Sequence, residues 1–379
     1  MTLNYLPKVK EQYEALPYPP RNPDDEHRRL IKTDAESLVA INHNCFGGKQ
    51  TFEHDFRVLV AGGGTGDSTI YLAEQLRDTN AKIVYLDLSS ASRAIAEQRA
   101  ANRKLTNIRF VTASILDIAE LKLGLFDYIS STGVLHHLDS PEQGLKALTR
   151  SLKPNGAIYL MLYGKYGRQP IYETQALLKS MIDSALPPRE QAQLARRVLA
   201  GLPPHHRFKQ VEGQWLREIA ESGYGDTGLF DLLLHSQDVA YTVEDVLQLS
   251  ESAQLHFIDF VGRAKPLYHP DNATQSPELL SLIKSHPRLE QMALTEQVRQ
   301  DITNHSFVMS NNADAQAKLT DTSLAPICVR ELGQYTQAIH DALVPGKYLD
   351  IKLNLEFEGQ SLQHTYEILG SETNKLLFK

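Results

Sequence analysis

Short apolar runs alternate with amphipathic segments through the first half of the chain. Apolar runs of strand length occur at 58–61, 83–88, 108–111, 128–130 and 157–162. Segments with apolar residues three and four positions apart separate these runs, at 68–78, 90–104 and 140–153. Each segment has Arg or Lys toward its end, which is typical of helices. The alternation predicts a parallel sheet with helices on both faces, the doubly wound form of the α/β class.

The pattern changes after Tyr163. Three short helices separated by Pro and Gly are predicted at 172–186, 188–202 and 211–225, and we interpret 165–240 as a helical insertion. The alternating order resumes at Thr242, which we expect to cap a helix that is followed by strands at 255–261 and 305–310. The sequence KPNG at 153–156 predicts a turn into the strand at 157–162.

The last part of the chain predicts a unit of its own. Residues 311–323 are polar and rich in Ala, Asp and Thr, as linkers often are, and 347–360 alternates apolar with polar residues like a half-buried strand. We therefore expect four regions. They are an N-terminal helical segment (1–40), a sheet domain in two pieces (41–164 and 241–310), the insertion (165–240) and a small C-terminal α+β accessory unit (311–379).

Composition narrows the class of protein and the kind of partner. Hydrophobic residues make up 42% of the chain and charged residues 22%, which is usual for a folded protein. The net charge of −7 gives no broad basic surface for nucleic acid or an anionic membrane. We expect a small-molecule or peptide partner and no nucleic acid.

Cysteine and histidine spacing gives no support for a disulfide framework or a metal site. The two cysteines, Cys45 and Cys328, lie far apart and outside any CxxC arrangement. None of the 14 histidines stands three or four residues from another, which removes the helical two-histidine metal motifs. The sequence also lacks a signal-like apolar start and any run near the roughly 18 apolar residues that cross a bilayer. We expect a cytoplasmic protein without a membrane segment.

Four glycines follow the first apolar run, in the sequence VLVAGGGTGDST at 58–69. Such a turn between a strand and a helix lets a ligand approach the backbone closely. A nicotinamide or flavin dinucleotide would need a small residue where Asp67 stands, and the Asp67 carboxylate would face a pyrophosphate at a helix N-terminus. S-adenosylmethionine has no phosphate, and Gly62, Gly64 and Gly66 meet its G-x-G-x-G turn. The sequence favours S-adenosylmethionine, with Gly63 also in the binding turn.

An acidic residue ends the second apolar run. Asp87 follows the last glycine by about 20 residues, the spacing that carries a carboxylate to a ribose. An Asp at this point also caps helices, but the glycine turn upstream favours the ribose role. We predict that Asp87, its neighbour Leu88 and the turn residue Asp67 line the cofactor site.

Five stretches together resemble the class I S-adenosylmethionine-dependent methyltransferases, in that family's order. They are VLVAGGGTGDST, VYLDLS, FVTASILDI, FDYISSTGVLHHL and LKPNGAIYLMLY. The resemblance covers about residues 40–310 apart from the insertion. It implies a seven-stranded Rossmann-like sheet, cofactor binding by the glycine turn and Asp87, and adenine contact by Ser114 and Ile115.

The chain departs from that family at two positions. Val60 stands where an acidic residue usually precedes the glycine turn, and Ser114 stands where many members have the adenine-binding Asp, which leaves Asp117 as a substitute. Two further stretches, EQYEALPYPPRNPDDEHRRL and YGKYGRQPIYETQ, are similar to a bacterial subgroup of these enzymes. That similarity indicates methyl transfer but does not identify the acceptor.

Two clusters are candidates for catalysis. Thr132, His136 and His137 follow the fourth predicted strand, where the sulfonium is expected, and one histidine would act as a general base. Alternatively, the histidines pack against the cofactor or cap the next helix. The second cluster is Tyr163, Tyr166, Arg168 and Tyr172. Here Arg168 would hold a substrate carboxylate, or it would stack on the tyrosine rings as a structural contact.

Taken together, the sequence predicts an S-adenosylmethionine-dependent methyltransferase. We expect the acceptor to be a protein or peptide side chain or a small metabolite, and we expect the tail to recognise a larger partner or to form an oligomer. Asn44, with Asn42 and His43, is expected over the methionine end of the cofactor, or simply at the end of a helix. A non-catalytic regulatory protein that binds the same cofactor and a nicotinamide-dependent reductase are the alternatives.

Overall fold

The computed structural model of the chain describes residues 5–33, 35–318, 336–344, 347–357 and 360–369. The chain divides into two compact units, Met1–Lys318 and Leu319–Lys379. The second unit contains α14 (Thr336–Ala342) and an antiparallel hairpin of β8 (Tyr348–Phe357) and β9 (Gln360–Leu369). The strand predicted at 347–360 is therefore present, while the burial of its side chains lies outside what is described.

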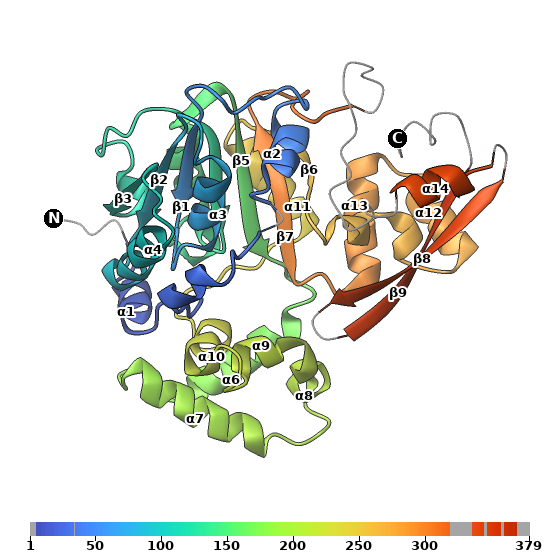
Figure 1. The fold of residues 1–379 in the computed structure, drawn as a ribbon. Helices are drawn as coiled ribbons and strands as arrows, with labels where there is room; N and C mark the ends of the chain where they lie inside the picture. Colours follow the sequence, from blue (N-terminus) through green and yellow to red (C-terminus); the bar gives the residue numbers. More distant parts are fainter. Residues whose placement is uncertain (1–4, 34, 319–335, 345–346, 358–359, 370–379) are drawn as a thin grey trace. The chain divides into compact units, whose positions relative to one another are not determined.

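A single seven-stranded sheet forms the core of the first unit (Figure 1). The strand order is β3-β2-β1-β4-β5-β7-β6, and only β7 runs antiparallel to its neighbours. The strands are β1 (Arg57–Ala61), β2 (Lys82–Asp87), β3 (Ile108–Thr112), β4 (Phe126–Thr132), β5 (Leu152–Tyr163), β6 (His256–Phe260) and β7 (Asn304–Ser310). This confirms the predicted doubly wound, seven-stranded α/β fold.

Alternate residues of the central strands enter two separate cores. Leu59 and Ala61 of β1 face a core covered by α5 (Pro141–Thr149), α11 (Val243–Ser252) and α13 (Arg288–Arg299). Val58 and Val60 face the opposite core, covered by α2 (Leu38–Cys45) and α3 (Asp67–Gln75). Burial on both faces explains why these strands are apolar runs without alternation in the sequence.

Local sequence signals predicted the start of one helix correctly and one turn incorrectly. Thr242 and Asp245 form the reciprocal capping box that begins α11, as the N-cap prediction required. The expected turn at 153–156 was wrong. These residues lie within β5 as an irregular bulge, because Leu152 pairs with Phe126 and the next matched pair is Ala157 with Tyr128. Pro154 has no N–H to donate, so it fits where the ladder is interrupted.

The helices between β5 and α11 form a separate layer below the sheet in Figure 1. They are α6 (Gln169–Met181), α7 (Pro188–Gly201), α8 (Arg207–Val211), α9 (Leu216–Ile219) and α10 (Gly225–Leu233), and they share a core of their own. The single helix predicted over 211–225 was wrong, because a short 3-10 turn precedes α9 and Gly223 packs against the Arg217 carbonyl. The two ends of this layer meet, since the Tyr241 N–H donates to the Tyr163 carbonyl over 2.9 Å.

Two helices that the sequence analysis left unassigned lie before β7. They are α12 (Pro277–Lys284), which Ser276 caps, and α13. The polar residues after β7 stay with the first unit as far as Lys318, because the Ala317 N–H donates to His43 and the Gly47 N–H to Ala315. Among the described residues, no helix combines the length and the apolar character that crossing a membrane requires.

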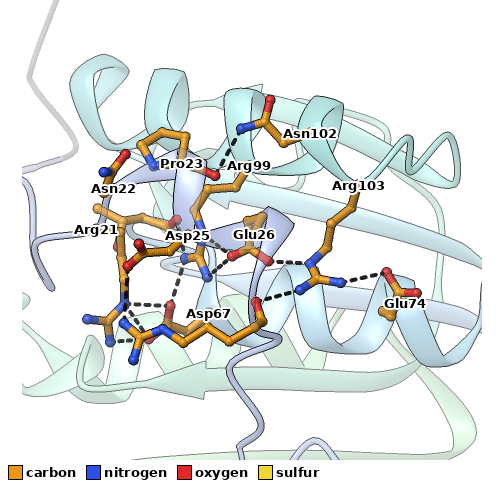
Figure 2. Close-up of polar contacts among 12 residues, drawn as sticks. Arg21, Asn22, Pro23, Asp25, Glu26, Asp67, Glu74, Arg99, Asn102 and Arg103 are labelled. Carbon is orange, nitrogen blue, oxygen red and sulfur yellow. Dashed lines mark hydrogen bonds and ion pairs between the residues drawn. The ribbon is translucent and has the colours of Figure 1, made fainter.

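A chain of ion pairs fastens the N-terminal segment to the sheet domain (Figure 2). The segment contains α1 (Pro7–Ala15) and a 3-10 turn (Pro23–His27), and it packs on α4 (Ser90–Asn102). Arg21 makes a bidentate pair with Asp67, and Arg99 bridges Asp67 and Glu26, each over 2.7 Å. Arg103 completes the chain by contacting Glu26. The Arg99 and Glu26 side chains are 1% and 2% exposed, so this network is shielded from water.

Removing Arg99 should therefore destabilise the fold far more than removing a surface arginine. An Arg99→Ala change leaves Glu26 buried without its main partner, and we expect a loss of about 3–5 kcal/mol in the free energy of unfolding. Arg28→Ala breaks an exposed pair with Asp25, and its effect should stay within about 1 kcal/mol. Urea denaturation of both variants measures the difference, and equal losses would contradict a stabilising network.

Candidate functional site

The turn between β1 and α3 has a backbone that only glycine tolerates. Gly62, Gly64 and Gly66 have φ angles of +80°, +49° and +103°. A Cβ at Gly62 would collide with Val134, and one at Gly63 would collide with the Tyr85 ring. The turn is therefore a cradle of bare main chain at the C-terminal edge of the sheet, where parallel sheets bind ligands.

Asp87 anchors this turn from the end of β2. Its Oδ2 accepts from the Gly64 N–H over 2.7 Å and its Oδ1 from the Ser89 N–H over 2.8 Å. Burial raises the pKa of the Asp87 carboxyl above its ordinary value, although these backbone N–H groups oppose the shift. Each carboxylate oxygen can accept a second hydrogen bond. The carboxylate can thus hold the turn and bind ligand hydroxyls at once.

The N-terminal segment passes directly over the turn. The Thr65 hydroxyl donates to the Pro19 carbonyl over 2.7 Å, and a Cβ at Gly64 would come within 2.9 Å of the Tyr18 carbonyl oxygen. Glu14 caps the N-terminus of α4 by accepting from the backbone of Ser90 and Ala91. A ligand in the cradle would therefore be covered by this segment.

The other predicted cofactor residues do not all gather at the cradle. Leu88, Thr132, Ser114 and Ile115 end or follow β2, β4 and β3 and so lie along the same edge of the sheet. Ser114 caps the short 3-10 turn that holds Ile115. Asp67 begins α3, but its carboxylate is held by two arginines, and these hold its pKa below the ordinary value against the effect of burial. Its contact with a cofactor stays a prediction.

Asn44 lies in α2, with both polar ends of its side chain engaged. It donates to the Ala40 carbonyl over 2.9 Å and accepts from Gln316 over 3.1 Å. It lines an enclosed cavity of about 70 Å³ together with Tyr128 and Tyr159. That volume is too small for a nucleoside cofactor. The contact of Asn44 with the methionine end of a cofactor stays a prediction.

A carboxylate that the sequence analysis missed does lie beside Val60. Glu36 is 2% exposed, and its Oε1 accepts from the Ser130 hydroxyl over 2.6 Å. Ser130 is the direct partner of Val60 across the β1–β4 pair. The N-terminal segment thus supplies a carboxylate beside the position on β1 where the resembled family usually has an acidic residue.

Three histidines meet where β4, β5 and the insertion come together. His137 and His235 are stacked, with ring centroids 3.7 Å apart, and His136 lies 4.0 Å from the Tyr163 ring. Burial lowers the pKa of all three histidines, so they are neutral near pH 7. The His137 Nδ1–H donates to the Gln237 carbonyl, which leaves its Nε2 as an acceptor. Neither His136 nitrogen has a hydrogen-bond partner among the described residues.

The N-terminal segment reaches this histidine cluster through Tyr13. The Tyr13 hydroxyl donates to Asp231 over 3.0 Å and lies 3.2 Å from His235 Nε2. Asp231 is 5% exposed, and burial raises the pKa of its carboxyl to about 7. Tyr13 lies 218 residues before Asp231, so no spacing signal could have joined it to Asp231 and His235.

Arg168 lies at the start of α6 and is 3% exposed. Its guanidinium stacks 3.6 Å from the centroid of the Tyr163 ring and 5.1 Å from that of Trp215. The predicted stacking contact is therefore present. Tyr166 is different, because the charges that surround it are those of Glu296, Glu244 and Asp245. The structure shows no contact between Tyr166 and the histidine cluster, so its catalytic role stays a prediction.

Two overlapping groups here offer atoms that bind metals. They are His136, His137 and Asp238, and His137, Asp231 and His235, with the atoms of each group within 4.8 Å of one another. In the second group the His235 Nδ1 accepts from the Gln237 N–H, so its Nε2 carries the proton and offers no lone pair. In the first group the nearby Arg168 charge, which also lowers the histidine pKa values, opposes a divalent cation. Acid–base chemistry suits both groups better.

Comparisons with known proteins fit this geometry. A model of the methyltransferase domain matches residues 59–158, which run from β1 into β5. An uncharacterized protein of Synechococcus is 30% identical over 271 residues, covering 70% of this chain and 62% of that protein. A malonyl-[acyl-carrier protein] O-methyltransferase of Paenibacillus is 31% identical, covering 37% of this chain and 48% of the relative. The chain thus spans less than two thirds of the length of these relatives.

A solved structure shares the fold. PKMT2 from Rickettsia typhi, in complex with AdoHcy, superimposes with a TM-score of 0.57 at 16% identity. The match covers 74% of this chain and 53% of that one. At this level of identity the likeness supports the architecture.

Asp231 should make stability depend on pH. In an unfolded chain Asp titrates near 3.9, and the folded value is about 7, so the folded state holds a proton that the unfolded state releases. The stabilisation is complete below about pH 4 and is lost as pH rises through about 7. Each pKa unit corresponds to about 1.4 kcal/mol, so we expect a decline of a few kcal/mol.

Urea denaturation at stepped pH values measures this decline. Asp231→Asn should remove the share of the pH-dependent decline in stability that comes from Asp231. Asp139→Asn, an exposed control, should retain the wild-type profile. The same pH dependence in Asp231→Asn and wild type would contradict the assignment.

Proposed function

We propose that the protein transfers a methyl group from S-adenosylmethionine to an acceptor bound beside His136 and His137. The match of residues 59–158 to a methyltransferase domain supports this reaction. The acceptor is a protein or peptide side chain or a small molecule rather than a nucleic acid. The net charge of −7 supports that choice. Because the chain spans only part of its relatives, their acceptors are not carried over.

The observation that carries this proposal is the pairing of a bare glycine cradle with the Asp87 carboxylate. Gly62 to Gly66 let a ligand touch the main chain, and Asp87 would accept from both ribose hydroxyls. Asp67, at the head of α3, is already paired with Arg21 and Arg99, so the glycine spacing rather than its charge favours a phosphate-free nucleoside. Ser114 and Ile115 would contact the adenine, and Glu36 would face the amino group of the methionine part. The residues present therefore fit the cofactor.

The histidine cluster would receive the proton that methyl transfer releases. S-adenosylmethionine, when bound, would supply an electrophilic methyl group on its positively charged sulfur. His136 is neutral and has an unpartnered nitrogen, which is the form that a general base requires. The nearby Asp238 carboxylate would stabilise the imidazolium that results.

Burial at this cluster excludes water from the reaction. His136 is 0% exposed and Arg168 is 3% exposed, so an acceptor can enter only if the insertion moves. We propose that residues 165–240 act as a lid on the two-part domain of 41–164 and 241–310, and that the second unit, Leu319–Lys379, recognises a partner.

Asp87→Ala should weaken cofactor binding. Loss of hydrogen bonds to a charged group predicts about ten- to a hundredfold weaker binding of S-adenosylhomocysteine, as measured by calorimetry. Asp78→Ala changes an exposed carboxylate in the turn after α3 and serves as the control, with no expected effect. Wild-type affinity in Asp87→Ala would remove the ribose role.

His136→Gln should slow turnover while leaving cofactor affinity unchanged. A general base contributes about 10²–10⁴-fold, so we expect kcat with labelled cofactor and a cell extract to fall by at least a hundredfold. Urea denaturation of His136→Gln checks that the variant is folded, since the change loses the ring contact with Tyr163. His256→Asn, on the exposed end of β6, is the control. Undiminished turnover in His136→Gln would exclude it as the base, and no turnover by the wild type would favour a non-catalytic binder.

A further inference from the structure

Arg168 is a buried positive charge without an ion-pair partner. It makes none of the ion pairs that connect described residues, although Asp231 and Asp238 lie close enough to influence its pKa and that of its neighbours. Burial of an unpaired charge costs several kcal/mol in proteins generally. Stacking on Tyr163 and Trp215 offsets only part of such a cost. A ligand carboxylate would therefore supply the direct ion pair that Arg168 makes with none of the described residues.

The unused donors of Arg168 lie on one edge of the guanidinium. Its Nε and Nη2 atoms are buried and make no hydrogen bond in the part of the chain that the structure describes. These two atoms carry parallel N–H bonds, which is the side-on geometry that a carboxylate accepts. The neighbouring Tyr172 hydroxyl lies close enough to the guanidinium for a weak hydrogen bond, although their contact does not reach normal hydrogen-bond geometry.

Other unpartnered atoms nearby complete a pattern. Asp238 Oδ1 is a buried acceptor without a donor, and His136 has two ring nitrogens without partners. Asp238 and His136 contribute atoms within 4.8 Å of each other. A ligand that satisfies all of these groups carries a carboxylate for Arg168 and an N–H or O–H for His136 and Asp238.

We propose that Arg168 binds a carboxylate of the methyl acceptor side-on, and that the substrates are carboxylic acids that carry an amino or hydroxyl group. This rests on the proposed methyl transfer at the same site. A monoanion fits better than a phosphate dianion, because a single guanidinium would hold it and the Asp238 carboxylate lies nearby. Peptide side chains without a nearby carboxylate are poorer substrates.

The carboxylate is the anchor and the amino or hydroxyl group is the nucleophile. Two N–H donors withdraw electron density from a bound carboxylate and so lower its nucleophilicity. The nitrogen or oxygen beside His136 forms the new bond to the methyl carbon, sulfur takes the electron pair of the broken bond, and His136 takes the released proton. The product therefore keeps its carboxylate.

The test uses the full chain, labelled S-adenosylmethionine and an ultrafiltered extract of small metabolites. We expect the labelled product to bind an anion exchanger and to carry a free carboxylate by mass spectrometry. The isolated acceptor and its primary amide are then compared as substrates. Wild type should prefer the acid by about ten- to a hundredfold in kcat/KM, since hydrogen bonds between charged groups are lost with the amide.

Arg168→Gln and Arg168→Lys separate binding of the carboxylate from folding. Arg168→Gln should abolish the preference for acid over amide by raising KM for the acid, with unchanged binding of S-adenosylhomocysteine. Arg168→Lys should keep only part of the preference for acid over amide, because an ammonium cannot make the bidentate pair. Arg207→Gln changes an exposed arginine of the same insertion, and it should keep the wild-type preference.

Three results would overturn the proposal. These are a labelled acceptor without a carboxylate, equal use of acid and amide by the wild type, and an acid preference that survives in Arg168→Gln. Absence of any labelled product would instead remove the methyl transfer on which the proposal rests.

Discussion

The hydrogen bond from the Gly64 N–H to the Asp87 carboxylate is the contact on which the site depends. It joins the turn after β1 to the end of β2, so the cradle and the acidic group keep a fixed spacing before any ligand arrives. A glycine is needed at position 64 because φ is positive and a side chain would approach the Tyr18 carbonyl. The cradle is thus prepared by the backbone and one half-buried acid.

The N-terminal segment connects this pocket to the acceptor cluster. Within α1, Glu14 caps α4 beside Asp87, and the preceding residue, Tyr13, hydrogen-bonds Asp231 of the insertion. The ion pairs of Arg21 and Arg99 then hold the rest of the segment on α3 and α4 (Figure 2). Through these contacts, one stretch of chain covers the cradle and supports the cluster where the methyl group would be transferred.

The sequence predicted the parts of the molecule that rest on local patterns. Apolar periodicity located all five strands from β1 to β5, and spacing singled out Gly62, Gly64 and Asp87, because a strand, a turn and the next strand lie close in sequence. Thr242 was identified as a cap for the same reason. The pattern failed at Pro154, where a bulge and a turn have the same residue chemistry.

Contacts between distant segments were beyond the sequence analysis. Tyr13, Asp231 and His235 meet only because the insertion folds back against α1, and Glu36 reaches Val60 only through the pairing of β1 with β4. The charge on Asp67 was visible, but its arginine partners were not, since Arg21 and Arg99 come from either side of it in the chain. Arg168 costs free energy because its charge is buried, and a sequence pattern does not show which side chains are buried.

A crystal structure of the protein with S-adenosylhomocysteine tests the central claim most directly. The account predicts both ribose hydroxyls within hydrogen-bond distance of Asp87, with the nucleoside resting on Gly62 to Gly66 beneath residues 13–19. A nucleoside found elsewhere, or an Asp87 side chain turned away from the sugar, would contradict it.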